Sequence, residues 1–171
     1  LGKRLARYGL PLHPEKTRLI RFTRPPWGGG GGPKKPPSKP ETFDLLGFTH
    51  HWGRSRKGRW IVKRRTSRSR LSRALRDLTR WCRGNRHLPV REQHRLLSLK
   101  LRGHYSYYGM TGNGDSISAY HHFAQRTWRK WPDRRSQRAA MNWEKFNRLL
   151  ERYPLPRPVV VHSVSRQSAN P

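Results

Sequence analysis

The sequence contains few acidic residues and almost no cysteine. Its 171 residues include nine Asp and Glu against 39 Lys and Arg, and one cysteine, Cys82. A single cysteine excludes an internal disulfide and a cysteine-based zinc knuckle. No Asp-x-Asp or Asp-Asp pair occurs, so the chain lacks the neighbouring carboxylates that hold two magnesium ions for nucleotidyl transfer. We therefore expect no metal site and no complete catalytic site in this chain.

Other common signals are missing as well. No His-x-x-x-His, Cys-x-x-Cys or Gly-x-Ser-x-Gly motif is present, which argues against zinc and against a serine nucleophile. No apolar run approaches the roughly 20 residues of a membrane span, and the first residues lack the apolar stretch of a signal peptide. We expect a cytoplasmic protein without a membrane partner. The chain begins with Leu1 rather than Met, which predicts a portion of a longer protein.

Positive charge is what the sequence has in excess. The formal net charge is +30, and a polyanion relieves such self-repulsion because its condensed counterions are released when its phosphates are neutralised. Between Arg54 and Arg86 there are 14 Lys or Arg and one acid, Asp77. A charge run is usually a solvated face, but the scarcity of interspersed acid favours phosphate contact here. Nucleic acid is therefore the expected partner.

Composition and periodicity divide the first part of the chain. Residues 25–40 are rich in Pro, Gly and Lys without periodicity, as is typical of a linker or extended loop. Before them, residues 1–8 predict a short helix that ends at Gly9. Residues 17–22 are rich in β-formers and predict a strand.

The pattern after the linker predicts a hairpin. Residues 42–49 and 60–63 are expected to form two strands joined by a basic turn between Gly53 and Gly58. Gly47 lies inside the first of these strands, where a glycine indicates a bulge or the close approach of another backbone.

Beyond Thr66, apolar residues recur at helical spacing. The stripes are Leu71-Leu75-Leu78-Cys82, then Leu97-Leu101 with Tyr105 or Tyr108, then Ile117-Tyr120-Ala124 with Thr127 or Trp128 and Trp131, and finally Trp143-Phe146-Leu150-Tyr153. They predict a bundle of four amphipathic helices, with Asp115 or Ser116 as the cap of the third. Tyr105 and Tyr108 are expected to pack in the core rather than stack on bases.

Three blocks of sequence occur in a fixed order. They are Leu10-Pro11-Leu12-His13-Pro14-Glu15-Lys16-Thr17-Arg18-Leu19-Ile20, then Thr42-Phe43-Asp44-Leu45-Leu46-Gly47-Phe48-Thr49, then Leu101-Arg102-Gly103-His104-Tyr105-x-Tyr107-Tyr108-Gly109. In this order they resemble the C-terminal part of bacterial group II intron-encoded reverse transcriptase/maturases, over residues 1–162. The ordered set is more specific than any one block.

The resemblance implies an α+β fold, in which a short strand remnant of the reverse-transcriptase palm precedes a mainly helical thumb. Its parts are the end of the palm at residues 1–66 with the insertion 25–40, the thumb or maturase (X) domain at 67–155, and an extended or disordered tail at 156–171. Lys16 would assist at the polymerase site, and Leu46, Gly47 and Phe48 would belong to a primer-grip-like hairpin. The family's Tyr-Ala-Asp-Asp motif has no counterpart here, so we expect no activity from this chain alone. Mg²⁺ is implied only for the complete family enzyme.

Both lines of reasoning lead to one expected set of nucleic-acid contacts. The set comprises Arg54, Arg56, Lys57, Lys63, Arg64, Arg65, Arg68, Arg70, Arg102 and His104. The implied partners are group II intron RNA, a DNA template-primer and the upstream palm and fingers of the same protein, and we expect no cofactor. Two alternatives remain open, a free-standing basic RNA-binding splicing factor and a ribosomal-type structural protein.

Overall fold

The computed structural model describes residues 2–11, 13, 17, 19–25, 41–133 and 141–162. The expectation for Lys16 lies outside these residues, as do those for most of the 25–40 insertion and for the tail beyond His162. By its contacts the chain divides into two compact units, residues 1–43 with 51–62, and residues 44–50 with 63–171. In the described part of the chain, no helix is long and apolar enough to cross a membrane.

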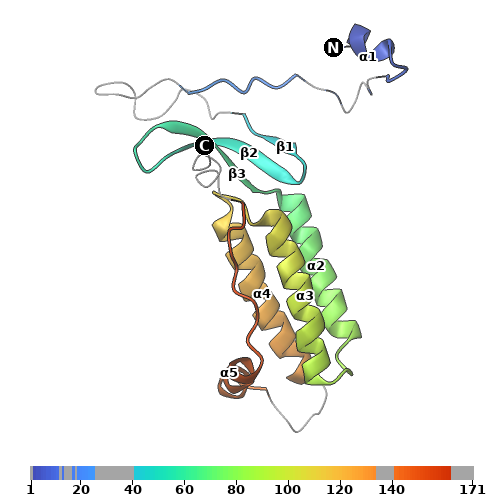
Figure 1. Ribbon diagram of the computed structural model, residues 1–171, viewed down its shortest axis with the longest axis vertical. Helices are drawn as coiled ribbons and strands as arrows, with labels where there is room; N and C mark the ends of the chain where they lie inside the picture. Colours follow the sequence, from blue (N-terminus) through green and yellow to red (C-terminus); the bar gives the residue numbers. More distant parts are fainter. Residues whose placement is uncertain are drawn as a thin grey trace, which may run out of the picture. The chain divides into compact units, whose positions relative to one another are not determined.

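The described strands form one three-stranded antiparallel sheet in the order β1-β2-β3, and helices follow it (Figure 1). The strands are β1 Phe43–Leu45, β2 Phe48–Arg54 and β3 Trp60–Thr66. Neighbours in the sheet are therefore neighbours in the sequence, as in a simple meander. The α+β class expected from the sequence is confirmed.

The predicted single strand at residues 42–49 is wrong, because a tight turn divides it. Leu46 and Gly47 join β1 to β2 and both have positive φ, 50° and 82°. Positive φ at both central residues is the pattern of a two-residue type I′ hairpin turn, whose twist matches the flanking strands. A Cβ on Gly47 would lie 3.3 Å from the Tyr108 hydroxyl. On the side where a Cβ would lie, the nearest neighbours of Gly47 are therefore the side chains of Tyr108 and Arg70.

The first unit begins with the short helix α1, Gly2–Ala6, and the chain leaves it through Gly9 at a φ of 67°. The predicted strand at residues 17–22 is absent from its described residues. The backbone N–H of Arg21 donates to the Glu41 carboxylate at 2.9 Å instead of to a neighbouring strand. The described strands pair only with one another in the order β1-β2-β3, so the β-propensity of this segment finds no partner among them.

Phe22 packs by its ring. It meets Phe43 edge-on at 4.9 Å between ring centroids and stacks on Trp52 at 5.2 Å. Through these aromatic contacts the segment around Phe22 packs against β1 and β2.

The helices of the second unit confirm the four predicted stripes. They are α2 Arg68–Gly84, α3 Val90–Tyr108, α4 Gly114–Asp133 and α5 Trp143–Arg152. Figure 1 shows α2, α3 and α4 side by side, and α4 packs against both of the others. Their stripes meet in one core that includes Leu78, Leu97, Leu101, Ile117 and Trp128. The predicted cap of α4 is wrong, because that helix begins at Gly114 and Asp115 lies in its first turn.

The short helix α5 lies at the end of the bundle where α2 ends and α3 begins (Figure 1). Its start is capped by Asn142, whose side chain accepts from the backbone N–H of Lys145 at 2.9 Å. Phe146 is fully buried and meets the Trp128 ring edge-on at 5.8 Å between centroids. This aromatic pair packs α5 against α4, and the Arg129 guanidinium of α4 lies over the Trp143 ring of α5 at 4.3 Å.

A buried asparagine joins the sheet to the bundle. The Asn113 side chain, 1% exposed, accepts from the backbone N–H of Thr66 at 2.7 Å and donates to its hydroxyl at 2.8 Å. It also donates to the carbonyl of Tyr108 at 2.7 Å. The end of β3, the end of α3 and the start of α4 thus converge on one amide group.

Gln93 performs a similar role at the other end of the bundle. Its amide oxygen accepts from the indole N–H of Trp128 at 3.0 Å, and its amide nitrogen donates to the carbonyl of Leu88 at 2.8 Å. The first turn of α3 is thereby tied both to α4 and to the loop before it. These bonds satisfy polar groups that burial would otherwise penalise.

The segment after α5 is extended and docks on the bundle, as far as His162 (Figure 1). Leu155 is 8% exposed and joins the core. The backbone N–H groups of Val161 and His162 donate to the carbonyl of Gly109 at 2.7 and 2.9 Å. Of the two expected states, extended and disordered, these residues adopt the first.

Gly109 is the position at which the docked segment comes closest to α3. A Cβ there would lie 2.3 Å from the carbonyl oxygen of Tyr105 and 2.6 Å from that of Val159. Both atoms belong to the backbone, so only a shift of the backbone could remove the clash. Gly109→Ala should lower the free energy of unfolding by about 2 kcal/mol or more, measured by urea denaturation.

Gly103→Ala is the matched control on the same helix. A Cβ at Gly103 meets nothing within 4 Å, and alanine is the better helix former by about 1 kcal/mol. We expect this variant to be as stable as the original protein or more so. Equal losses in the two variants would contradict the close docking at Gly109.

Candidate nucleic-acid interface

The turn between β2 and β3 carries the first group of predicted cations. Arg54, Arg56 and Lys57 are all exposed. The Arg54 guanidinium lies over the Trp60 ring at 4.9 Å and donates to the carbonyl of Gly58 at 3.3 Å. Cation–π stacking holds an arginine in place without neutralising it. This turn, in the first unit, therefore presents fixed positive charge to solvent.

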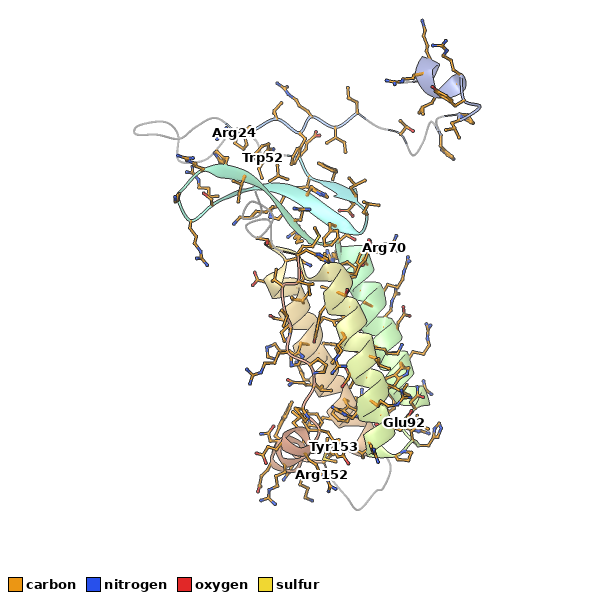
Figure 2. All side chains as sticks on the ribbon, viewed as in Figure 1. Arg24, Trp52, Arg70, Glu92, Arg152 and Tyr153 are labelled. Carbon is orange, nitrogen blue, oxygen red and sulfur yellow. The ribbon has the colours of Figure 1, made fainter. Side chains whose placement is uncertain are left out.

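The second group follows β3 into α2. Lys63 and Arg64 are half-buried, whereas Arg65, Arg68 and Arg70 are exposed. Figure 2 places Arg70 at the N-terminal end of α2. The first turn of α2 has no acidic residue, and Ser67 makes no side-chain capping bond. The positive end of the helix dipole therefore adds to these side chains in attracting anions.

These cations lack acidic partners within the described residues. The ion pairs present there, Arg80 with Asp77, Arg95 with Glu92 and Arg148 with Glu144, all lie on helix surfaces. None of the eight hairpin and α2 cations joins them. An external anion is therefore the available source of neutralisation.

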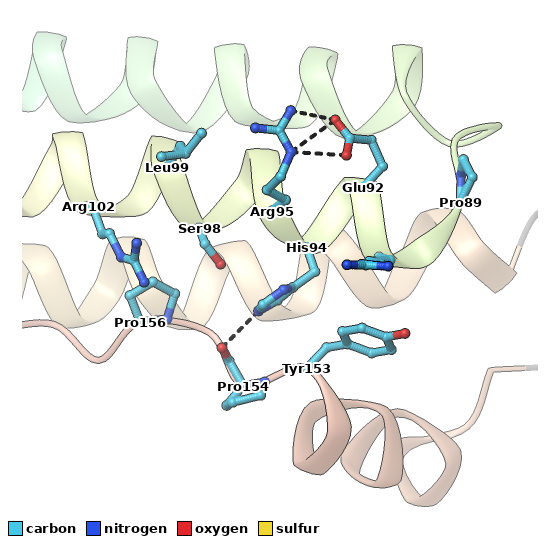
Figure 3. A pocket seen from close by; sticks show the side chains of 11 residues that line it. Pro89, Glu92, His94, Arg95, Ser98, Leu99, Arg102, Tyr153, Pro154 and Pro156 are labelled. Carbon is cyan, nitrogen blue, oxygen red and sulfur yellow. Dashed lines mark hydrogen bonds and ion pairs between the residues drawn. The ribbon is translucent and has the colours of Figure 1, made fainter.

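The structure adds a basic groove that the sequence did not predict. It has a volume of about 800 Å³ and lies between α3 and the segment after α5 (Figure 3). Arg91, Arg95 and Arg102 line it at spacings of four and seven residues, which place them along one face of α3. Of these, only Arg102 belongs to the predicted set. The spacing was a usable signal, but the opposite wall depends on tertiary docking.

Neutral groups complete this groove. A ring nitrogen of His94 is hydrogen-bonded to the carbonyl of Pro154 at 2.9 Å, and this bond joins α3 to the segment after α5 (Figure 3). Ser98 is buried, and its hydroxyl has no hydrogen-bond partner among the described residues. Hydrogen bonding from Arg95 lowers the pKa of Glu92. Arg95 is thus paired with Glu92. Arg102, the groove residue predicted from the sequence, has no carboxylate partner in the described chain.

His104 differs from the other predicted contacts because its ring packs among tyrosine rings. Its ring stacks on Tyr120 at 3.7 Å between centroids and lies 4.7 Å from the Tyr108 ring. Its Nε2 is buried without a hydrogen-bond partner in the described part of the protein. Burial lowers the pKa of His104 to about 4. The imidazole is consequently neutral at physiological pH and cannot act as a cation toward phosphate.

The Leu46-Gly47-Phe48 turn is brought against α3 and the start of α2. The Tyr107 hydroxyl donates to the carbonyl of Leu46 at 2.9 Å, and the backbone N–H of Ser67 donates to the carbonyl of Gly47 at 2.9 Å. Phe48 is 6% exposed, whereas Leu46 is 76% exposed. The turn is therefore fixed by neighbouring elements while its leucine faces solvent.

No group of three or more His, Cys, Asp or Glu side chains suited to a metal ion occurs among the described residues. Burial raises the pKa of the single thiol, Cys82, to about 12, which keeps it protonated and unreactive.

Comparisons with known proteins found no counterpart. No protein-family model, no curated protein sequence and no solved structure matches this chain.

Acid should destabilise the protein through His104. Because its pKa is near 4 when folded and about 6.5 when unfolded, the unfolded state binds the proton more readily. The contribution of neutral His104 to the unfolding free energy is complete above pH 6.5 and is lost as the pH falls toward 4. The loss should be roughly 1–2 kcal/mol after allowance for partial exposure. His104→Phe, which keeps a ring beside Tyr120, should flatten the dependence of unfolding free energy on pH over this window. Parallel pH profiles for the two proteins would contradict the buried neutral state.

Leu46 should be replaceable with a gain in stability. A leucine in the left-handed region is disfavoured by about 1 kcal/mol, and asparagine tolerates that conformation better. Leu46→Asn should therefore raise the unfolding free energy by roughly 0.5–1 kcal/mol, measured by urea denaturation. Leu45→Asn, in the adjoining strand, is the control and should give no gain, because β1 disfavours asparagine. A loss in Leu46→Asn as large as in the control would contradict the turn geometry.

Proposed function

We propose that this chain is an RNA-binding portion of a group II intron-encoded reverse transcriptase/maturase, covering the end of the palm and the thumb. In this role it grips intron RNA and template-primer during splicing and RNA-directed DNA synthesis. Nucleotidyl transfer belongs to residues that this chain does not contain. The expected binding mode is contact with the phosphate backbone, which positions the nucleic acid without reading its sequence.

The observation that carries the proposal is unneutralised charge. With a net charge of +30, the hairpin turn and the start of α2 present cations without carboxylate partners in the described chain. A solvated surface normally intersperses charges of both signs. A surface of one sign is instead suited to a polyanion, which it attracts over distance and holds by counterion release.

The order of elements also supports it. A β-hairpin followed by a basic helical bundle is the order that the resemblance implies for palm end and thumb. The Leu46-Gly47-Phe48 turn packs on α3 through Tyr107, so the second and third blocks of the resemblance meet in space. Phosphate-binding arginines on rigid strands and helices hold a nucleic acid in one register better than flexible tails do.

Affinity for structured RNA should fall steeply with salt. Each neutralised phosphate contributes about 0.7–0.9 to the slope of log affinity against log salt. Arg65→Gln with Arg68→Gln removes two exposed cations and should lower that slope by about 1.5. The loss should be similar for unrelated RNA sequences, as measured by fluorescence anisotropy at several salt concentrations.

Lys145→Gln with Arg152→Gln is the charge-matched control. It also removes two positive charges, from the exposed surface of α5, and should change the slope much less. If both double variants lose the same affinity, binding reflects net charge rather than the face formed by β3 and α2. A flat salt dependence in the unmodified protein would overturn phosphate contact altogether.

Crosslinking of the chain to cellular RNA, followed by sequencing, separates the alternatives. Enrichment of one intron supports the proposed function. Recovery of ribosomal RNA in stoichiometric amounts would favour the ribosomal-type structural protein. Enrichment of spliced transcripts that lack a group II intron would favour the free-standing splicing factor.

A further inference from the structure

A second cavity, distinct from the groove of Figure 3, lies against the β1–β2 turn and the last turns of α3. Its volume is about 710 Å³, within the usual range for small-ligand sites. Leu46, Phe48, Tyr107 and Met110 form apolar parts of its wall, and Arg64 lines it as well. All its lining residues belong to the second unit. The cavity is therefore a property of that unit alone.

Tyr107 is the distinctive side chain of this cavity. As a whole residue Tyr107 is 54% exposed, whereas Tyr105 is 4% exposed and Tyr108 packs against the core. The sequence-based expectation that Tyr105 and Tyr108 pack inside is confirmed. Tyr107, on the adjoining face of α3, is left open to solvent. A tyrosine needed only for packing would be buried.

The exposed ring is nevertheless held in place. Its hydroxyl donates to the carbonyl of Leu46 at 2.9 Å. Its plane is within 18° of the Phe48 ring at 6.0 Å between centroids, and the Tyr108 ring meets it edge-on at 4.7 Å. Such fixing removes rotamer entropy before any ligand arrives, which favours binding. A flat, pre-oriented and solvent-facing aromatic ring is the usual platform on which single-stranded nucleic acids stack their bases.

Charge narrows the class of ligand. No acidic residue lines the cavity, and Arg64 has no carboxylate partner in the described chain. The occupant must therefore offer a flat apolar surface joined to an anion. An unpaired nucleotide has both, since its base has two π-faces and its phosphate is charged. A base inside a duplex cannot enter, because its faces are covered by its neighbours.

We propose that this cavity binds one unpaired nucleobase, stacked on Tyr107, with an adjoining phosphate on Arg64. The proposal rests on the RNA-binding function proposed above and adds a substrate class to it. Backbone contacts at the hairpin and α2 do not distinguish paired from unpaired nucleic acid. The Tyr107 cavity makes that distinction and directs the protein toward loops, bulges and strand ends.

The test compares two oligonucleotides of equal charge. One is a fluorescent 12-nucleotide oligouridylate, and the other has the same ribose-phosphate backbone without bases. Because stacking of one base is worth about tenfold in affinity, the unmodified protein should bind the base-containing probe about tenfold more tightly. Tyr107→Leu should bind both probes equally, at the affinity of the unmodified protein for the abasic one.

Two further variants separate stacking from structure. Tyr107→Phe keeps the ring and loses the bond to Leu46, so it should retain most of the preference for bases. Trp143→Leu removes an exposed aromatic ring from α5 and should leave the preference unchanged. Circular dichroism and thermal unfolding of each variant verify that the fold is kept.

Each contrary outcome points to a different cause. Equal binding of the two probes by the unmodified protein would overturn the base site and leave phosphate binding standing. Failure to bind either probe would overturn both proposals. A lipid is the other ligand with apolar and anionic parts. If Tyr107→Leu abolished binding to vesicles of 70% phosphatidylcholine and 30% phosphatidylglycerol while base preference persisted, the cavity would be a lipid site instead.

Discussion

The amide group of Asn113 holds together the part of the molecule that presents the candidate interface. It is buried, and it bonds to the end of β3 and to the end of α3 while its own backbone leads into α4. Loss of one partner from such a site costs about 1–3 kcal/mol, because the remaining groups stay buried and unpaired. No apolar residue of the same size would satisfy the same three elements. Asn113 thus joins the end of β3 to the end of α3, which also carries Tyr107, the residue bonded to the β1–β2 turn.

The helices were the predictable part of the fold. Core residues such as Leu78, Leu101 and Phe146 recur at helical spacing, and that spacing is a local property of the chain. The strand pattern was less informative. Nothing in the sequence indicates that Leu46 adopts a left-handed conformation, because that conformation is imposed by the twist of the strands that it joins. Residues 17–22 failed for a related reason, since a strand exists only where another strand pairs with it.

The candidate site divides in the same way. Exposure of Arg65, Arg68 and Arg70 follows from residue type, since a charged side chain is rarely buried without a partner. The packing of the His104 ring could have been expected from the sequence, because this residue lies three positions after Leu101 and four before Tyr108, on the buried stripe. The groove along α3 could not be predicted from local pattern, since one of its walls is a segment that lies 60 residues further along the chain, as the bond from His94 to Pro154 shows. The sequence pattern was thus enough to predict where the exposed cations lie, whereas the cavities could be found only from the packing of the folded chain.

The docked segment after α5 also has a consequence for the order of events during synthesis. Thr111 and His162 are 51 positions apart in the chain, yet their backbones are bonded. Contacts of such separation form late, because the intervening chain must first be made and then closed into a loop. A growing chain therefore presents the basic hairpin and α2 well before the α3 groove exists. The nascent chain therefore displays its positively charged surface before its shaped groove, which forms only when translation of residues 153–156 has been completed.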